Sequence, residues 1–457
     1  MIEKYPSQIV TIGNIPLGGG HPIIIQSMTN TNTLDTGATV EQVKRIVAAG
    51  GQMVRITVPT MKEVGALQAI RDQLRSEGLS VPLVADVHYH PEVAEACARI
   101  VEKVRVNPGN FTDKRNLKQL DLTESEYAES ANRMARRAAP LFEICKRHHT
   151  TLRIGINHGS LCDRIVSRYG NTPLAMVMSA MEWVDICHEN DFRNVVFSMK
   201  SSNVHTMIEA TLLLAEKMRA AGKCYPLHLG VTEAGAGDEG RAKSAAGIGT
   251  LLLSGIGDTI RVSLTENPEN EIPAAIILAN IREEIKNTEQ HIDGHKLTIK
   301  YNEPGREKWL IVCAAAAGYA HYHQHITELQ LINPFFTADE CRYVTEIILQ
   351  ACRIKMTRTE FISCPSCGRT QYDIQDALAK VKSRFSHYPD LKIGVMGCVV
   401  NGPGEMADAD FGIVGAGSGK VLVYKQKEKI TTSITIDDAL NVLEQLIHDR
   451  KSSSSTF

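Results

Sequence analysis

Eight short β-rich runs recur between residues 22 and 264, and polar or glycine-bearing residues and then a helical pattern follow each run. Strand–helix units repeated in series predict an α/β fold, a closed (β/α)8 barrel of the TIM type. An open doubly wound sheet is the alternative, but no glycine fingerprint follows the first run. The runs are 22–27, 53–58, 81–87, 103–106, 152–156, 194–199, 226–231 and 259–264.

Apolar residues at helical spacing predict amphipathic helices between these strands. The helices are expected at 40–49, 62–75, 132–146, 202–219 and 242–253. Gly18, Gly19 and Gly20 precede the first strand and indicate a hairpin that leads into the barrel.

A barrel of this kind takes roughly 250 residues, so a chain of 457 has room for further domains. We expect a barrel over 1–285, a connector or short insertion over 286–355, a smaller α/β domain over 356–450 and a disordered tail over 451–457. In the second domain the pattern predicts strands near 391–395, 411–414 and 421–425, and helices at 374–385 and 436–448. Thr435, with Asp438 three residues later, predicts the start of the last helix.

Composition limits the class of protein. Hydrophobic residues make up 43% and charged residues 22%, as in soluble globular proteins, and a net charge of -2 offers no bulk attraction to nucleic acid or a membrane. The first residues lack a signal-peptide pattern and no apolar stretch is long enough to span a bilayer, so a cytoplasmic protein is expected. In that compartment the 11 cysteines are expected to be buried thiols, metal ligands or reactive groups.

Five of the eight predicted strands end in a cation. The carboxyl ends of barrel strands build the active site, so these side chains are expected to converge on one mouth. Several cations in a partly desolvated pocket favour an anion among them, and guanidinium groups suit phosphate oxygens, which predicts a phosphorylated ligand such as a diphosphate. The alternative is that each cation pairs with a carboxylate, although the strand ends supply few acids. The cations are Arg55, Arg105, Arg153, Lys200 and Arg261.

Polar and acidic groups accompany these cations. Asp86 and His88 are two residues apart and point to the same face of a strand, where His88 by itself is typical of a structural residue. Glu233, in the sequence VTEAGAG, is either a neutralising partner of Lys200 or Arg261 or an acid/base group beside bound substrate, and we favour the second. Neutral groups suited to hydroxyls and phosphate oxygens are Asn107, Asn157, Ser201, Thr232 and Ser263.

Three cysteines mark the second domain. Cys364 and Cys367 form a C-x-x-C pair in FISCPSCGRT, and Cys398 follows in VMGCVVNGPGE. A thioredoxin-type pair needs no third cysteine, and a structural zinc site normally has four cysteine or histidine ligands. Three thiolates leave one position of a cubane iron–sulfur cluster open, and Glu405, beyond an Asn-Gly-Pro-Gly turn, can fill it with a more readily displaced ligand. The alternative is that Glu405 is a surface acid and Cys398 a buried thiol.

The sequences FISCPSCGRT, MGCVVNGPGEMADADFG, RIGINHGSL, VRVNPGN and HLGVTEAG resemble motifs of the 4-hydroxy-3-methylbut-2-enyl diphosphate synthase family. The resemblance covers 5–285 and 356–450. It implies a barrel with a smaller α/β iron–sulfur domain, and the reductive ring opening of 2-C-methyl-D-erythritol 2,4-cyclodiphosphate with loss of water. It also implies a 4Fe-4S cluster and reduced ferredoxin or flavodoxin as electron donor.

The resemblance also implies roles for individual residues. Cys364, Cys367, Cys398 and Glu405 match the cluster ligands, and Glu233 matches a barrel carboxylate near the reacting carbons. The matches for diphosphate and hydroxyl contacts are Arg55, Arg105, Asn107, Arg153, Asn157, Lys200, Arg261 and Ser263.

Two forms of this family differ in chain organisation. The compact form joins the barrel to the cluster domain almost directly and works as a homodimer, whereas a larger form inserts an extra domain and closes on itself. The motifs here resemble the larger form, yet 286–355 is too short for another barrel. A homodimer and a self-closing chain therefore both remain open.

Two other functions compete with the reductase. A pterin-type transferase on a related barrel would need no iron, and the cysteines argue against it. A metal-binding module beside an inert barrel is the non-enzymatic reading, and the five strand-end cations argue against that.

Overall fold

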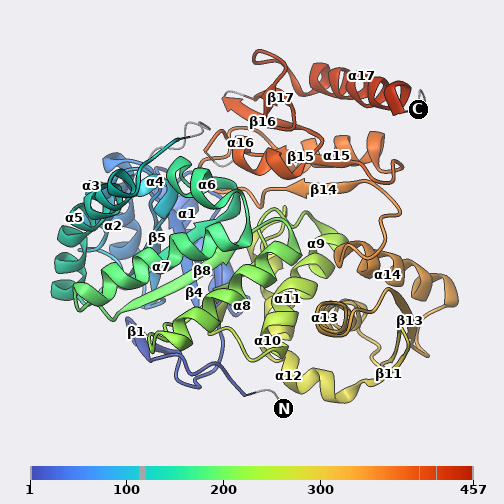
Figure 1. Ribbon diagram of the computed structural model, residues 1–457, viewed down its shortest axis with the longest axis horizontal. Helices are drawn as coiled ribbons and strands as arrows, with labels where there is room; N and C mark the ends of the chain where they lie inside the picture. Colours follow the sequence, from blue (N-terminus) through green and yellow to red (C-terminus); the bar gives the residue numbers. More distant parts are fainter. Residues whose placement is uncertain (1–2, 113–119, 401, 418, 455–457) are drawn as a thin grey trace.

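A closed parallel barrel forms the first part of the molecule, as the strand–helix repeat predicts (Figure 1). The computed structural model describes residues 3–112, 120–400, 402–417 and 419–454. Eight parallel strands run in the order β8-β7-β6-β5-β4-β3-β10-β9, and a bridge from Phe197 to Leu227 joins the two ends of this order. The strands are β3 (Ile24–Met28), β4 (Met53–Thr57), β5 (Leu83–Asp86), β6 (Lys103–Val106), β7 (Thr151–Asn157), β8 (Val195–Lys200), β9 (His228–Leu229) and β10 (Thr259–Ile260).

Helices surround these strands, and the larger ones begin with hydrogen-bonded caps. Thr60 and Glu63 form a capping box at the start of α2, and Thr123 and Glu126 form another at the start of α5. The segment predicted as one helix over 242–253 is divided by a π-helical turn at Ala245–Gly249. The helices are α1 (Thr36–Ala48), α2 (Met61–Ser76), α3 (Pro91–Cys97), α4 (Pro108–Phe111), α5 (Glu124–His148), α6 (Asp163–Tyr169), α7 (Pro173–Glu189), α8 (Val204–Ala220), α9 (Gly237–Ser244), α10 (Thr250–Leu253), α11 (Glu271–Ala279) and α12 (Ile281–Glu284).

A hairpin closes the amino end of the barrel. Strands β1 (Val10–Ile12) and β2 (Ile15–Leu17) pair antiparallel just before Gly18, Gly19 and Gly20, as expected for a hairpin leading in. The side chains of Val10, Ile12 and Leu17 are buried and share one apolar cluster with residues near the starts of four barrel strands. Burial of this apolar surface fixes the hairpin beneath the barrel.

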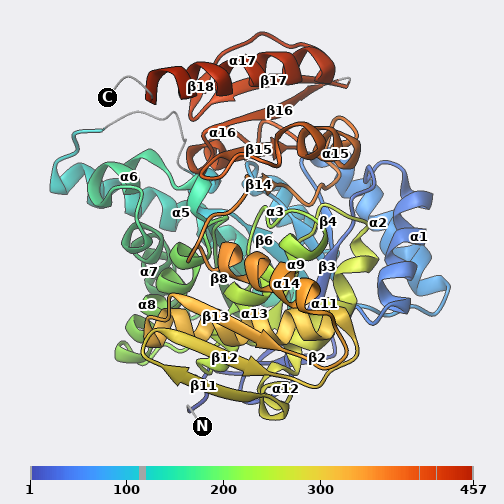
Figure 2. The ribbon, with the colours of Figure 1, turned by 90° about the vertical axis from the view of Figure 1, so that its right-hand side faces the viewer.

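Residues 289–351 form a small folded unit where the sequence indicates a connector or insertion. Its sheet has the order β11-β12-β13, and α13 connects the parallel pair β12 and β13. Helix α13 is buried on nearly every side, because the sheet covers one side and barrel helices the other; Gly249 on the barrel lies so close that a Cβ there would be 2.3 Å from Ala315. Figure 2 shows the sheet on the outside of this helix. The elements are β11 (Glu289–Asp293), β12 (Lys296–Lys300), α13 (Arg306–Gln324), β13 (Glu328–Ile332) and α14 (Ala338–Ala351).

The C-terminal domain lies over the carboxyl ends of the barrel strands (Figures 1 and 2). Its sheet has the order β14-β15-β16-β17-β18, parallel through β16 and antiparallel after it. The last helix continues to Ser454, so residues 451–454 are helical and the prediction of disorder over them is wrong; 455–457 lie outside the described residues. The elements are β14 (Glu360–Ser363), α15 (Ile374–Phe385), β15 (Lys392–Met396), α16 (Gly402–Glu405), β16 (Phe411–Gly417), β17 (Lys420–Lys425), β18 (Glu428–Lys429) and α17 (Ile436–Ser454).

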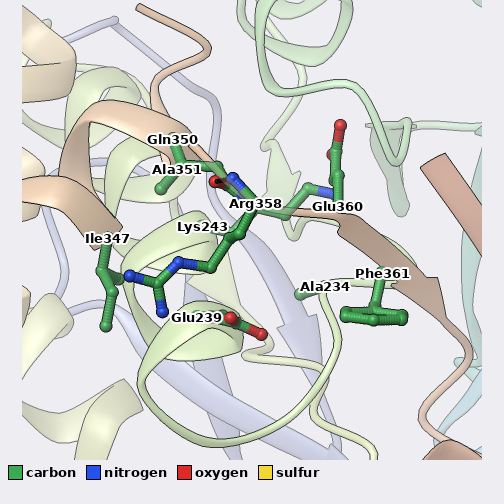
Figure 3. Close-up of a pocket in the computed structure, with 9 residues that line it drawn as sticks. All are labelled: Ala234, Glu239, Lys243, Ile347, Gln350, Ala351, Arg358, Glu360 and Phe361. Carbon is green, nitrogen blue, oxygen red and sulfur yellow. Dashed lines mark hydrogen bonds and ion pairs between the residues drawn. The ribbon is translucent and has the colours of Figure 1, made fainter. Parts of the chain in front are cut away.

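The three parts of the chain meet at one charged junction. Glu360 of β14 accepts from Lys243 of α9 at 2.8 Å and from Arg353, just after α14, at 3.1 Å. Figure 3 shows the small cavity beside this junction, lined from the barrel, the middle unit and the C-terminal domain. Burial alone would raise the pKa of Glu360, but Lys243 and Arg353 outweigh it and hold that pKa at about 2. The junction therefore fixes the C-terminal domain on its own barrel through an ionised carboxylate.

The described residues contain no helix with the length and apolar character needed to cross a bilayer.

Candidate active site

One cavity joins the barrel mouth to the loop after β14 within the same chain. The predicted barrel contacts line it, with the exceptions of Asn107 and Ser201, and Cys364 and Cys367 line it from the C-terminal domain. Its complete lining is Met28, Arg55, Asp86, His88, Arg105, Arg153, Asn157, Lys200, Thr232, Glu233, Arg261, Ser263, Cys364, Pro365, Ser366, Cys367 and Arg369.

The five strand-end cations converge as the sequence predicts, but only two of them have a carboxylate partner among the described residues. Arg261 makes a two-pronged contact with Glu271, at 2.9 and 3.1 Å, and Arg105 lies 3.3 Å from Asp86. Arg153 is 1% exposed, and its Nε and Nη1 have no hydrogen-bond partner in the part of the chain that the structure describes. Glu271 was not foreseen, because it lies at the start of α11 and not at a strand end.

Burial and mutual repulsion make the cation layer costly without an anion. Desolvation is the main cause that lowers the pKa of Arg55 to about 10, and Arg261 and Arg105 lower it further against the pull of Asp86. Lys200 is also buried, and desolvation first, then Arg153 and Arg55, hold its pKa well below the ordinary lysine value. A bound anion would offset both effects, since it favours the charged form of every cation around it.

Asp86 is the carboxylate that organises the β5 and β6 side of the mouth. Its Oδ1 accepts from Arg105, and its Oδ2 lies 3.5 Å from Nε2 of His88. Arg105 also donates to the carbonyl of Gly155 and to Oδ1 of Asn157, which fixes its guanidinium across the mouth. Desolvation first, then Arg369 and Arg105, lower the pKa of His88 to about 3, so this imidazole is neutral. His88 thus lines the site, beyond the structural role that its spacing alone suggests.

Glu233 lies in the loop after β9 with a strained backbone. Its φ of 51° is in the left-handed region, which is uncommon for a residue with a side chain, and the side chain is 6% exposed. One carboxyl oxygen, Oε2, has no hydrogen-bond partner among the described residues. Burial raises the pKa of Glu233, and this favours a carboxyl that holds a proton beside the cavity.

The thiols of Cys364, Cys367 and Cys398 gather where two strands of the C-terminal domain end. Cys364 follows β14, and a Cβ on Gly397, just after β15, would lie 2.8 Å from Oγ1 of Thr370 and 3.4 Å from the Cys364 sulfur, so glycine lets the Cys398 loop approach. Burial raises the pKa of the Cys364 thiol, and Cys367, Glu233 and Cys398 raise it further. Soft thiolates at close range are the donor set that iron–sulfur clusters use, so these residues fit such a group.

Glu405 is buried at the end of α16 and lies against the barrel. A Cβ on Gly159, in the turn His158–Ser160 after β7, would be 2.5 Å from its Oε1. Within the described ranges no three His, Cys, Asp or Glu side chains form a compact site for a single ion.

Asn107 does not line the cavity. Its Oδ1 accepts from the backbone N–H of Gly109 at 3.1 Å, and its Nδ2 donates to Ser160 at 2.8 Å. These bonds cap the short helix α4 (Pro108–Phe111). The structure therefore gives this residue a positioning role at the rim, and its contact with substrate stays a prediction.

Four lining residues were not singled out from the sequence, and two of them, Met28 and Arg369, contact the charged groups of the site. The sulfur of Met28 accepts from Arg55 at 2.8 Å and from Arg261 at 3.3 Å, and so holds two cations without neutralising them. Arg369 donates to Asp86 from the C-terminal domain. Its position two residues after Cys367, inside the C-x-x-C motif sequence, was the available signal.

Comparison with known proteins covers both large parts of the chain. A family model described as the GcpE TIM-barrel domain matches residues 7–276, and one described as the GcpE protein C-terminal domain matches residues 360–449.

Curated relatives match the chain along nearly its whole length. The 4-hydroxy-3-methylbut-2-en-1-yl diphosphate synthase (flavodoxin) of Phocaeicola vulgatus is 37% identical over 602 residues, covering 97% of this chain and 98% of the relative. The 4-hydroxy-3-methylbut-2-en-1-yl diphosphate synthase (ferredoxin) of a Synechococcus species is 41% identical over 450 residues, covering 98% and 94%. The first alignment is longer than the 457-residue chain, so that relative has segments that this chain lacks.

Proposed function

The chain belongs to the 4-hydroxy-3-methylbut-2-enyl diphosphate synthase family, and on that premise we propose how its own residues carry out the reaction of this family. The reaction opens the ring of 2-C-methyl-D-erythritol 2,4-cyclodiphosphate and removes one oxygen as water, which requires two electrons and two protons. Reduced flavodoxin or ferredoxin supplies the electrons, as the names of the relatives indicate. One observation carries the proposal: buried cations and paired thiols line the same cavity.

The cation layer binds the cyclic diphosphate. Arg55, Arg153 and Lys200 have no carboxylate at ion-pair distance in the described chain, so their charge is available to phosphate oxygens. The planar guanidinium of Arg153 can contact two oxygens at once. Asn157 and Ser263 line the same cavity and provide neutral hydrogen bonds for the remaining oxygens.

Cys364, Cys367, Cys398 and Glu405 would hold a 4Fe-4S cluster, which supplies electrons one at a time when bound. Cys364 and Cys367 face the cavity directly, so the group that they hold would lie over the substrate. Glu405, a harder and more readily displaced ligand than thiolate, would hold the fourth position of this group.

Glu233 holds a proton for the oxygen that leaves as water. Its buried carboxyl has a raised pKa, and its Oε2 has no hydrogen-bond partner within the described ranges, which suits a general acid in the low-dielectric mouth. The cation layer keeps the substrate's phosphates beside it and excludes bulk water by charge pairing. The pterin-type transferase and the metal-binding module are not favoured, because the curated relatives are synthases of this one family.

Anaerobic purification with iron and sulfide analysis tests this function. About four irons and four sulfides per chain are expected, together with turnover of the cyclic diphosphate by a chemically reduced flavodoxin or ferredoxin. Cys398→Ser is expected to lose the intact cluster, because a hydroxyl is a poor replacement for thiolate on iron. Stoichiometric zinc with no visible absorbance, or a Cys398→Ser variant with full iron content and turnover, would refute the assignment.

A further inference from the structure

Arg369 connects the cysteine loop of the C-terminal domain to the barrel mouth. It follows Cys367 by two residues, yet its guanidinium donates to Oδ2 of Asp86 at 3.2 Å and to the Asp86 carbonyl at 3.0 Å. The side chain of Arg369 is 10% exposed and that of Asp86 is 3% exposed. The two residues are 283 positions apart, so this ion pair exists only while the C-terminal domain is seated on the barrel.

Asp86 is shared between this contact and the cation layer. Arg105 uses one of its oxygens, and Arg369 and His88 use the other. Two guanidinium groups, one from the barrel and one from the C-terminal domain, therefore share the charge of one buried carboxylate. A phosphate that attracts Arg105 weakens the attraction between Arg105 and Asp86. The Asp86 carboxylate is then less neutralised and attracts Arg369 more strongly.

The other contacts of the cysteine loop are neutral. Thr265 donates to the carbonyls of Ser363 and Cys364, at 3.3 and 3.1 Å, and the chain at Ala234 pairs with Ser363 as an isolated β-bridge. A Cβ on Gly368 would lie 2.8 Å from the Thr31 carbonyl, so this side of the loop rests on the barrel backbone. These contacts hold the loop in place but carry no charge that could respond to an anion. Among the described residues, Arg369 is the ionic contact of this loop with the mouth.

We propose that Arg369 is a positioning residue that couples occupation of the diphosphate site to seating of the cysteine loop over the barrel. The inference rests on the proposed function of the mouth and deepens it. It requires no contact between Arg369 and the substrate: the guanidinium acts through Asp86. When the anion binds, the Arg369–Asp86 pair tightens, and the loop that carries Cys364 and Cys367 is held at the correct distance from the substrate.

Hydrogen exchange on the anaerobically purified full-length protein tests this coupling, with inorganic diphosphate as the probe. In the wild type, diphosphate is expected to increase amide protection at 363–370 and at the facing barrel loop 31–35. Arg369→Met is expected to bind diphosphate within about threefold of wild type but to lose this added protection. The matched control is Arg384→Met, since Arg384 pairs with Glu444 on the exposed side of the same domain and should keep the response.

Kinetics give a second measurement. Arg369→Met is expected to keep its iron content and a KM within about threefold of wild type, while kcat falls about tenfold or more, because small misplacement of reacting groups is costly. If this variant does not fold, Arg369→Lys serves instead: it keeps the charge but cannot make both contacts, so an intermediate loss is expected. Wild-type protection together with wild-type kcat in Arg369→Met would overturn the inference. A wild-type protein that fails to bind diphosphate would contradict the proposed function itself, and the inference with it.

Discussion

At the scale of single residues, the main feature of the site is a layer of buried cations whose charge nearby carboxylates offset only in part. Lys200 and Arg153 are buried, and moving a charge into a protein interior costs several kcal/mol unless a partner offsets it. Glu271 and Asp86 offset part of the layer and leave the remainder for a ligand. An anion bound among these cations would therefore stabilise the protein.

Lys200 gives this charge a pH dependence. Its pKa is lowered in the free protein, mainly by burial, and a bound diphosphate would raise it, so binding takes up a proton at pH values between the two. Affinity for diphosphate is therefore expected to be highest below the lowered pKa and to fall as pH rises through this window. Calorimetry in buffers of different ionisation heat measures the uptake. Equal proton uptake in wild type and Lys200→Met would contradict the assignment to Lys200.

Arg153→Lys tests the geometry of the guanidinium separately from its charge. A lysine keeps the charge but presents a single point, so two forked contacts to phosphate become one. We expect the dissociation constant for diphosphate to rise about tenfold, since a charge-assisted hydrogen bond contributes roughly 1.5 to 3 kcal/mol. The visible spectrum of the purified protein should not change. An unaltered dissociation constant would count against Arg153 as a phosphate contact.

At the scale of elements, turns and short helices bring the separate groups of the site together. The turn His158–Ser160 after β7 contacts α16, so the barrel is in contact with Glu405, the residue predicted to hold the fourth iron. Gly159 permits this contact: an added Cβ would lie 2.5 Å from Oε1 of Glu405 and 3.1 Å from its backbone nitrogen. A side chain at Gly159 must therefore displace Glu405 or the turn.

Gly159→Ala is expected to move Glu405 without deleting it. The electron paramagnetic resonance signal of the reduced, substrate-free protein should change, because a ligand near iron has moved, while diphosphate affinity stays within about twofold. The control is Gly65→Ala on α2, where a Cβ meets nothing within 4 Å and alanine should stabilise the helix by about 0.5–1 kcal/mol. If the signal is the same in Gly159→Ala and wild type, Glu405 does not act at the iron.

The barrel could be predicted from the sequence because its strands are fully buried runs separated by amphipathic helices, and this repeat is visible locally. The fold of the middle unit, residues 289–351, could not be predicted in this way. Strand β11 is exposed along its whole length, so it has no alternation, and residues 309–318 of α13 are apolar and buried on all faces, so they show no amphipathic stripe. The strand-end cations were found by their position in the repeat, whereas Glu271, Arg369 and the capping role of Asn107 depend on contacts between elements, which no local pattern records.

At the scale of the whole molecule, one chain supplies both halves of the cavity. The self-closing organisation and the homodimer were both open from the sequence, and in this structure the C-terminal domain covers the mouth of its own barrel. A unit much smaller than a barrel, 289–351, is enough to bring the chain back to that position. Its α14 and Arg353 lie at the junction with Lys243 and Glu360.

Glu360→Gln tests how much this junction contributes to stability. The change leaves Lys243 buried without a carboxylate, so the free energy of unfolding should fall by about 3 kcal/mol at pH 7. In the wild type, a pKa of about 2 means that this stabilisation is complete above the ordinary glutamate value and is lost as pH falls toward 2. Denaturant unfolding followed by a probe in the C-terminal domain measures both effects.

The matched control for this junction is Glu346→Gln. Glu346 is 40% exposed and pairs with Arg358 at 3.2 Å, so its loss should cost less than about 1 kcal/mol and leave the acid dependence unchanged. Equal losses in the two variants would mean that the buried junction is no stronger than a surface pair.

The hairpin beneath the barrel also determines at which end small molecules enter and leave. Val10, Ile12 and Leu17 pack into the amino end of the barrel and close it. Substrate, product and water must therefore all enter and leave at the carboxyl end. The C-terminal domain, which is predicted to deliver electrons, covers this opening. Substrate and product must therefore pass the edge of this domain, so any movement of the domain that admits or releases them sets an upper limit on kcat.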